Sequence, residues 1–136
     1  MIKIKRCRSY ITFFLEEPFR QLIEHGEVFT IRRYHRKQGL VEVRRNKRGQ
    51  PIGLATVEFV GFVKKENGGF VVVDENGKVI SKLDKFVSKS GFGSLESWIG
   101  AYQKIYKRPQ DYFSFGRLYR VQLVKLYNEN LKYSIF

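Results

Sequence analysis

The spacing of hydrophobic residues in the first half of the chain predicts one short helix among several strands. Over Glu17–His25 the apolar residues recur every three or four positions, as in an amphipathic helix, and Gly26 follows as a C-terminal cap. Around this helix, apolar and polar residues alternate, which is typical of strands with one buried face. We therefore expect strands over Ile2–Lys5, Val28–Arg33, Leu40–Arg45 and Ile52–Val63, the last of them bent at Gly61.

The second half of the chain predicts a hairpin and a longer helix. Asp74–Gly77 has the residue types of a tight turn, so Phe70–Val73 and Val79–Ile80 should pair across it. After this hairpin the period changes from two to about 3.6. Ser94 is suited to cap a helix that continues to Tyr106, and its apolar stripe, which includes Trp98 and Ile105, should pack into the core.

A closing strand and the element order together indicate the fold class. Alternation over Tyr119–Leu123 predicts the last strand. Because helices do not alternate regularly with strands, we expect an α+β domain with about five to seven mostly antiparallel strands, curled into a small β-barrel, and two or three short helices. The 136 residues contain no linker-like tract, so we expect a single domain over residues 1–136, with 127–136 as a C-terminal tail.

Charge is the most informative feature of the composition. The formal net charge is +13 and the isoelectric point is about 10.0, a balance that favours a polyanionic partner. The density is greatest between Arg32 and Arg48, where eight basic residues face a single acid, Glu42. Tyr34 and His35 lie among these cations, so an aromatic ring for base stacking accompanies charges for phosphates. The candidate RNA-binding residues are Thr30, Arg32, Arg33, Tyr34, Arg36, Lys37, Arg44, Arg45, Lys47 and Arg48.

Several other classes of protein are disfavoured. No apolar run approaches the roughly 20 residues of a membrane-spanning helix, and no basic amphipathic helix indicates a membrane partner. A single cysteine, Cys7, excludes an internal disulfide and a cysteine-rich zinc site, and two histidines without a metal-binding spacing predict no metal centre. The glycine-rich nucleotide-binding motifs are also missing, so we expect no cofactor and a cytoplasmic location.

Three segments resemble one known family. A short helix ending in Gly26 precedes Thr30–Arg32 on a strand, Ser90–Trp98 is similar to a "glycine, aromatic, then helix" segment, and Leu118–Leu123 resembles a closing strand. In this order they resemble ASCH domains, relatives of the PUA fold, over about residues 15–126. The resemblance implies a PUA-like barrel with a cleft that binds RNA or a modified nucleoside.

The resemblance also bears on catalysis. Some ASCH relatives hydrolyse N4-acetylcytidine with a lysine, a threonine and a glutamate, and others are reported to be ribonucleases. The threonine matches Thr30 and the motif's arginine matches Arg32, but Glu27 stands where the lysine is expected. Only Asp84 could replace the glutamate, with Lys85 as a displaced lysine. Two of three catalytic positions are therefore altered, and we expect binding rather than catalysis.

The leading interpretation is an RNA-binding module with phosphates on the basic surface and a base in a cleft at Thr30 and Arg32. One alternative is an ASCH-type hydrolase, either a ribonuclease or an amidohydrolase acting through Thr30, Asp84 and Lys85. Another is a basic accessory protein of a ribonucleoprotein such as the ribosome. The alternative to a binding role for Arg32 is that its side chain is solvated or pairs with Glu27 or Glu42. Phe113 and Phe115 are candidates for a stacking platform or for a loop folded onto the core.

Overall fold

We analysed a computed structural model, and the description covers residues 9–128. The predicted strand Ile2–Lys5, Cys7 and residues 129–136 of the predicted tail lie outside this range. The elements, in chain order, are β1 (Tyr10–Thr12), α1 (Glu16–His25), β2 (Glu27–Arg32), β3 (Gly39–Arg44), β4 (Gly53–Glu66), β5 (Gly69–Val73), β6 (Val79–Lys82), the 3₁₀ helix η1 (Leu83–Lys89), α2 (Leu95–Ile105), α3 (Gln110–Phe113) and β7 (Arg117–Leu126).

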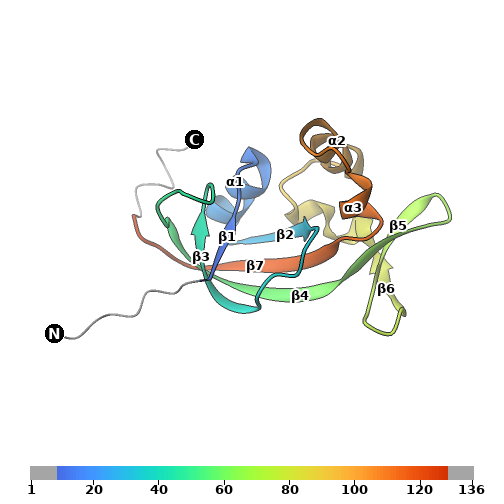
Figure 1. Ribbon diagram of the computed structural model, residues 1–136, viewed down its shortest axis with the longest axis horizontal. Coiled ribbons are helices and arrows are strands. Elements are labelled where there is room, and N and C mark those ends of the chain that lie inside the picture. Colours follow the sequence, from blue (N-terminus) through green and yellow to red (C-terminus); the bar gives the residue numbers. More distant parts are fainter. Residues whose placement is uncertain (1–8, 129–136) are drawn as a thin grey trace.

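The long strand β4 organises a seven-stranded mixed sheet (Figure 1). It pairs antiparallel with β7, and it also pairs with β3 near its start and with β5 near its end. The sheet continues from β3 to β1, which is parallel to it, from β5 to β6 and from β7 to β2. The β4–β7 register shifts between Phe59 and Gly61, where the sequence predicts a bend. The predicted α+β class is confirmed.

The sheet does not close into the barrel that the sequence predicts. Within residues 9–128, each of β1, β2 and β6 pairs with only one neighbouring strand, so the sheet is open. The physical reason lies beside β2, which contacts α1, η1 and α3 instead of a second strand. Helices thus take the place that a closing strand would need.

The helices lie on one side of the sheet and cover two separate core clusters (Figure 1). Leu22 and Ile23 of α1 pack into the first cluster, together with residues from β1, β3, β4 and β7. Trp98 and Tyr102 of α2 pack into the second. Trp98 is 1% exposed, as expected of a core anchor, whereas Ile105 at the end of the predicted apolar stripe is exposed.

Local signals in the sequence account for the helix ends. Gly26 has φ = 77°, a left-handed conformation that favours glycine, and its N–H donates to the carbonyl of Leu22. The Ser94 hydroxyl accepts a hydrogen bond from the N–H of Ser97 at 3.0 Å and caps α2. In the β5–β6 hairpin, the Asp74 side chain accepts hydrogen bonds from two backbone N–H groups of its own turn.

The loop before α2 packs closely against α1 at Gly91. Gly91 has φ = 92°, and a Cβ there would overlap the backbone of Glu17 and Pro18. Gly91→Ala should lower the free energy of unfolding by about 2 kcal/mol, because a left-handed alanine is strained and the backbones must separate. Gly93→Ala is the matched control, since nothing lies within 4 Å of its Cβ position. Urea denaturation of the two variants checks this, and equal stabilities would contradict the packing.

Candidate nucleic-acid interface

A pocket of about 250 Å³ opens between the two core clusters. Its walls come from the segment between β1 and α1, from the end of β2 and the residues after it, and from α2 and α3. Strand β2 separates the clusters, since Val28 faces the first and Ile31 the second. The pocket is lined by Thr12, Phe13, Phe14, Leu15, Pro18, Thr30, Ile31, Arg32, Arg33, Tyr34, Arg36, Tyr102, Tyr106 and Tyr112.

Two arginine side chains in this pocket lack the partners that buried arginines usually have. The Nε atoms of Arg32 and Arg36 are buried, and neither has a hydrogen-bond partner among the described residues. The Arg32 guanidinium carbon lies 4.8 Å from the centre of the Phe13 ring, and the backbone N–H of Arg36 donates to the Tyr119 hydroxyl at 2.7 Å. The backbone of Arg36 is thereby held in place, while guanidinium groups of both residues keep free donors.

The electrostatics of the pocket favour an anion. Burial lowers the pKa of Arg32 from its ordinary value, and the positive charge of Arg36 lowers it further. Arginine nevertheless stays charged at neutral pH. Burial raises the pKa of Tyr106 and of Tyr112, so both phenols stay neutral. Arg32 and Arg36 therefore converge beside neutral hydroxyl groups, and the described lining contains no carboxylate. The third arginine of the lining, Arg33, pairs with Asp111, which lies outside it.

Three tyrosines form a preorganised aromatic wall. The Tyr102 hydroxyl donates to the backbone carbonyl of Ile31 at 3.0 Å, which ties α2 to β2. The rings of Tyr106 and Tyr112 stack with centres 4.3 Å apart, and the Tyr102 ring meets Tyr112 edge to face at 5.0 Å. Because the three rings already pack against one another, binding of a ligand would not have to order them.

The sequence did not single out these tyrosines as binding residues. Tyr102 and Tyr106 belong to a stripe of apolar residues with three- and four-residue spacing, which is equally the pattern of a core-facing helix, and Tyr102 is indeed 3% exposed. The available signal was chemical: a buried tyrosine needs a partner for its hydroxyl group, whereas leucine or phenylalanine does not. That requirement indicates a polar neighbour but does not identify it.

The predicted basic cluster is divided by the fold, and part of it is structural. Arg44 pairs with Glu42 at 3.1 Å and lies over the Tyr10 ring at 4.4 Å. Glu42 is 5% exposed, and the ion pair with Arg44 compensates the burial of its charge. Arg45 lies over the Phe19 ring at 4.2 Å.

The remaining members of the predicted set differ in position. Thr30, Arg32, Arg33, Tyr34 and Arg36 are brought together by the pocket. Lys37, Lys47 and Arg48 are exposed and lie outside its lining. The cluster is thus a pocket with outlying surface cations rather than one continuous basic face.

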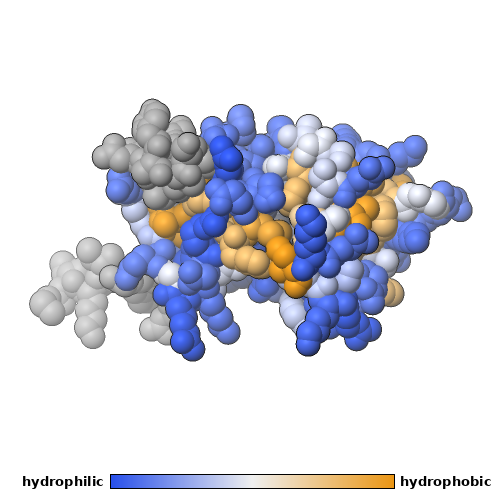
Figure 2. All heavy atoms as spheres, turned by 90° about the horizontal axis from the view of Figure 1, so that it is seen from above, coloured by the Kyte–Doolittle hydropathy of each residue, from blue (hydrophilic) through white to orange (hydrophobic). Residues whose placement is uncertain are grey.

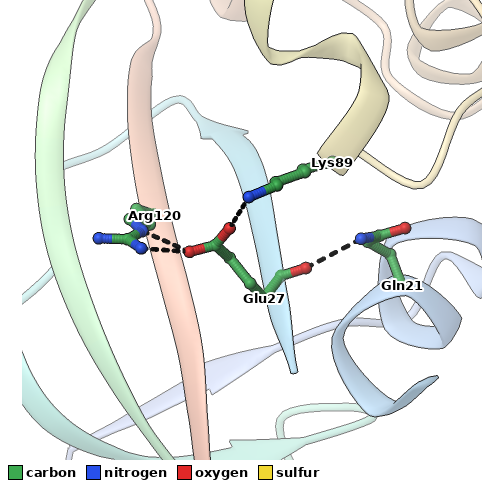
Figure 3. A network of polar contacts seen from close by, with 4 residues as sticks. All are labelled: Gln21, Glu27, Lys89 and Arg120. Atoms are coloured by element: carbon green, nitrogen blue, oxygen red, sulfur yellow. Dashed lines mark hydrogen bonds and ion pairs between the residues drawn. The ribbon is translucent and has the colours of Figure 1, made fainter. Parts of the chain in front are cut away.

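Arg32 does not pair with either of the acids considered for it. Glu42 binds Arg44, and Glu27 binds Lys89 at 2.7 Å and Arg120 at 2.5 Å (Figure 3). The Glu27 backbone carbonyl also accepts a hydrogen bond from Gln21 of α1 at 3.1 Å. Glu27 therefore joins α1, β2, η1 and β7, which is a structural role.

The candidate catalytic residues are not assembled in the pocket. Thr30 is 3% exposed and lines the pocket, whereas Asp84 and Lys85 are exposed on η1 and do not line it. In the described part of the chain, the lining offers no Asp, Glu, His or Lys side chain as a general base for Thr30. The two candidates for a stacking platform differ in exposure: Phe113 is buried in the second cluster, and Phe115 is exposed.

Comparisons with models of known protein families, with curated protein sequences and with solved structures found no match to this chain. None of the helices within residues 9–128 is both long and apolar enough to cross a lipid bilayer. Over the same residues, His, Cys, Asp and Glu side chains form no group of three that could hold a metal ion. The chemistry of the pocket itself therefore carries the functional argument.

The Glu27 network predicts a specific dependence of stability on pH. The hydrogen bond from Lys89, with that from Arg120, holds the pKa of Glu27 below its ordinary value against the opposing effect of burial. This stabilisation is complete above the unfolded-state pKa of about 4.3 and is lost as the pH falls through the lower folded-state value. At pH 7, Glu27→Gln should therefore reduce the free energy of unfolding by about 1 kcal/mol.

Urea denaturation at pH 7 and at pH 3 measures this effect, and the difference between the wild type and Glu27→Gln should narrow at pH 3. Glu24→Gln is the matched control, because Glu24 is a more exposed acid, in α1, whose ion pair with Arg20 is longer, at 3.8 Å. A Glu27→Gln deficit that is the same at both pH values would contradict the assignment.

Proposed function

We propose that this protein is an RNA-binding module whose pocket holds a nucleotide of a single-stranded segment. The observation that carries the proposal is the pair of buried, unpartnered Nε atoms of Arg32 and Arg36. A buried donor without a partner costs about 1–3 kcal/mol, and more when the group is charged, so a ligand that supplies acceptors has a strong advantage. A phosphate provides both the negative charge and oxygen acceptors that match a guanidinium.

The aromatic wall supports a nucleotide over a simple anion. Tyr106 and Tyr112 line the same pocket as the two arginines, so a base could lie against a ring while its phosphate meets a guanidinium. The pocket, at about 250 Å³, has room for an unstacked nucleotide and none for a duplex. RNA-binding proteins commonly read such unstacked bases in single strands, loops and ends.

Exposed cations outside the pocket would add to the attraction for a polyanion. Hydrophilic residues cover much of the face seen from above, the side on which the helices lie (Figure 2). Lys37, Lys47 and Arg48 are exposed cations that would add salt-dependent attraction to the backbone of the strand. We further propose that the protein binds RNA in the cytoplasm.

A distant relationship to ASCH domains is part of the same proposal. Its support is that Thr30 and Arg32, which carry the resemblance in sequence, both line the pocket. A PUA-like architecture would here be an opened form of the barrel, in which β1, β2 and β6 are edge strands. A hydrolase is not proposed, because Asp84 and Lys85 lie outside the lining.

Removing the Arg32 guanidinium tests the proposal directly. Arg32→Gln should weaken binding of a fluorescent oligouridine about tenfold, because a charge-assisted contact to phosphate is lost. The slope of log K against log salt concentration should also fall by about one. Fluorescence anisotropy at several salt concentrations measures both quantities.

Lys65→Gln is the control, since it removes one exposed positive charge of the β4–β5 hairpin, outside the pocket lining. It should change the affinity much less than Arg32→Gln does. Equal affinities of the wild type and Arg32→Gln, or no binding of RNA at low salt, would overturn the proposal.

A further inference from the structure

A second groove, of about 230 Å³, adjoins the pocket. It is lined by Arg33, Tyr34, Arg108, Asp111 and Phe115, and it shares Arg33 and Tyr34 with the pocket. These shared residues place the two hollows side by side. A strand with one nucleotide in the pocket would therefore have this groove as a neighbouring surface.

The groove carries two large aromatic rings that the fold leaves exposed. Tyr34 is 60% exposed and Phe115 is 72% exposed, whereas the neighbouring Phe113 is 3% exposed. The Arg33 guanidinium carbon lies 5.0 Å from the centre of the Tyr34 ring, which gives that ring a cation–π contact. Exposed rings beside arginines are the usual surface for stacking unpaired bases.

The charges of the groove favour a base over a phosphate. Asp111 lies 3.1 Å from Arg33 and 3.7 Å from Arg108, so a carboxylate already pairs with both arginines. A second anion placed between them would be repelled by Asp111 and would compete for the same donors. The pocket differs, because Arg32 and Arg36 converge there without a carboxylate in the described lining.

We propose that this groove is a second nucleotide subsite, in which the base next to the pocket-bound nucleotide stacks on Tyr34 and Phe115. The inference rests on the proposed function and names its ligand more closely: at least two consecutive nucleotides of a single strand. The phosphate of one nucleotide meets Arg32 and Arg36, and the strand continues past Tyr34 so that the adjoining base reaches the exposed rings.

The test compares ligands that fill one subsite or both. Uridine monophosphate, the dinucleotide pUpU and an eight-residue oligouridine would be titrated into the full chain by calorimetry. For the wild type, pUpU should bind about tenfold more tightly than the mononucleotide, in line with one additional base stacked on an aromatic ring. Phe115→Ala should remove most of this gain and leave the affinity for the mononucleotide nearly unchanged, because Phe115 lines the groove and not the pocket. Tyr34 lines both, so Tyr34→Ala should weaken binding of pUpU more than binding of the mononucleotide.

Both substituted rings are exposed, so the variants should fold, and Val124→Ala provides a control at an exposed apolar residue of β7. If Arg32→Gln weakens all three ligands but Phe115→Ala and Tyr34→Ala weaken none, the second subsite is wrong and the RNA-binding proposal stands. If Arg32→Gln has no effect on any ligand, the RNA-binding proposal itself fails. Equal affinity of the wild type for pUpU and the mononucleotide would also overturn the second subsite.

Discussion

The functional account depends on one constraint: Arg32 and Arg36 are half-buried, and they converge in a pocket whose described lining has no carboxylate. Two like charges in a partly desolvated pocket oppose each other, and their unpaired donors add to the cost. The surrounding fold must therefore supply enough packing to hold them together. The two hydrophobic clusters on either side of β2 do so, and the pocket is the space between them.

Strand β2 connects this constraint to the rest of the molecule. Its first residue, Glu27, is tied to α1, η1 and β7, while its last residue, Arg32, enters the pocket. The antiparallel pairing with β7 fixes the register between these ends. The Tyr119 hydroxyl on β7 then holds the backbone of Arg36, where the chain has left the sheet. The polar contacts of Glu27 thus fix the start of β2, and the pairing with β7 fixes the position of Arg32 at its end.

The sequence was informative where the signal is local. Periodicity and capping residues predicted α1 and α2 within a residue or two, and alternation of apolar and polar residues predicted the strands β2, β3 and β4. The three-residue strand β1 and the short helices η1 and α3 are too brief to show a period, and they were missed. The prediction of a closed barrel was wrong, because pairing between distant strands depends on where the helices pack.

Charge density along the chain could not separate the arginines that line the pocket from those that support the fold. Arg45 belongs to the same dense run as Arg36, but the fold places it over the ring of Phe19, which is distant in sequence. Thr30 and Arg32, for which the sequence predicts a cleft, both line the pocket. The tyrosine wall required knowledge of how α2 and α3 meet β2, which no local pattern contains.

The most direct measurement follows the Nε–Hε signals of the arginine side chains by NMR while oligouridine is added. The account predicts that the signals of Arg32 and Arg36 shift and exchange more slowly with water, because phosphate oxygens accept their free hydrogen atoms. The Arg44 and Arg45 signals should change little, since these residues serve the fold. Shifts confined to Arg44, Arg45 and Arg48, with Arg32 and Arg36 unchanged, would contradict the central claim.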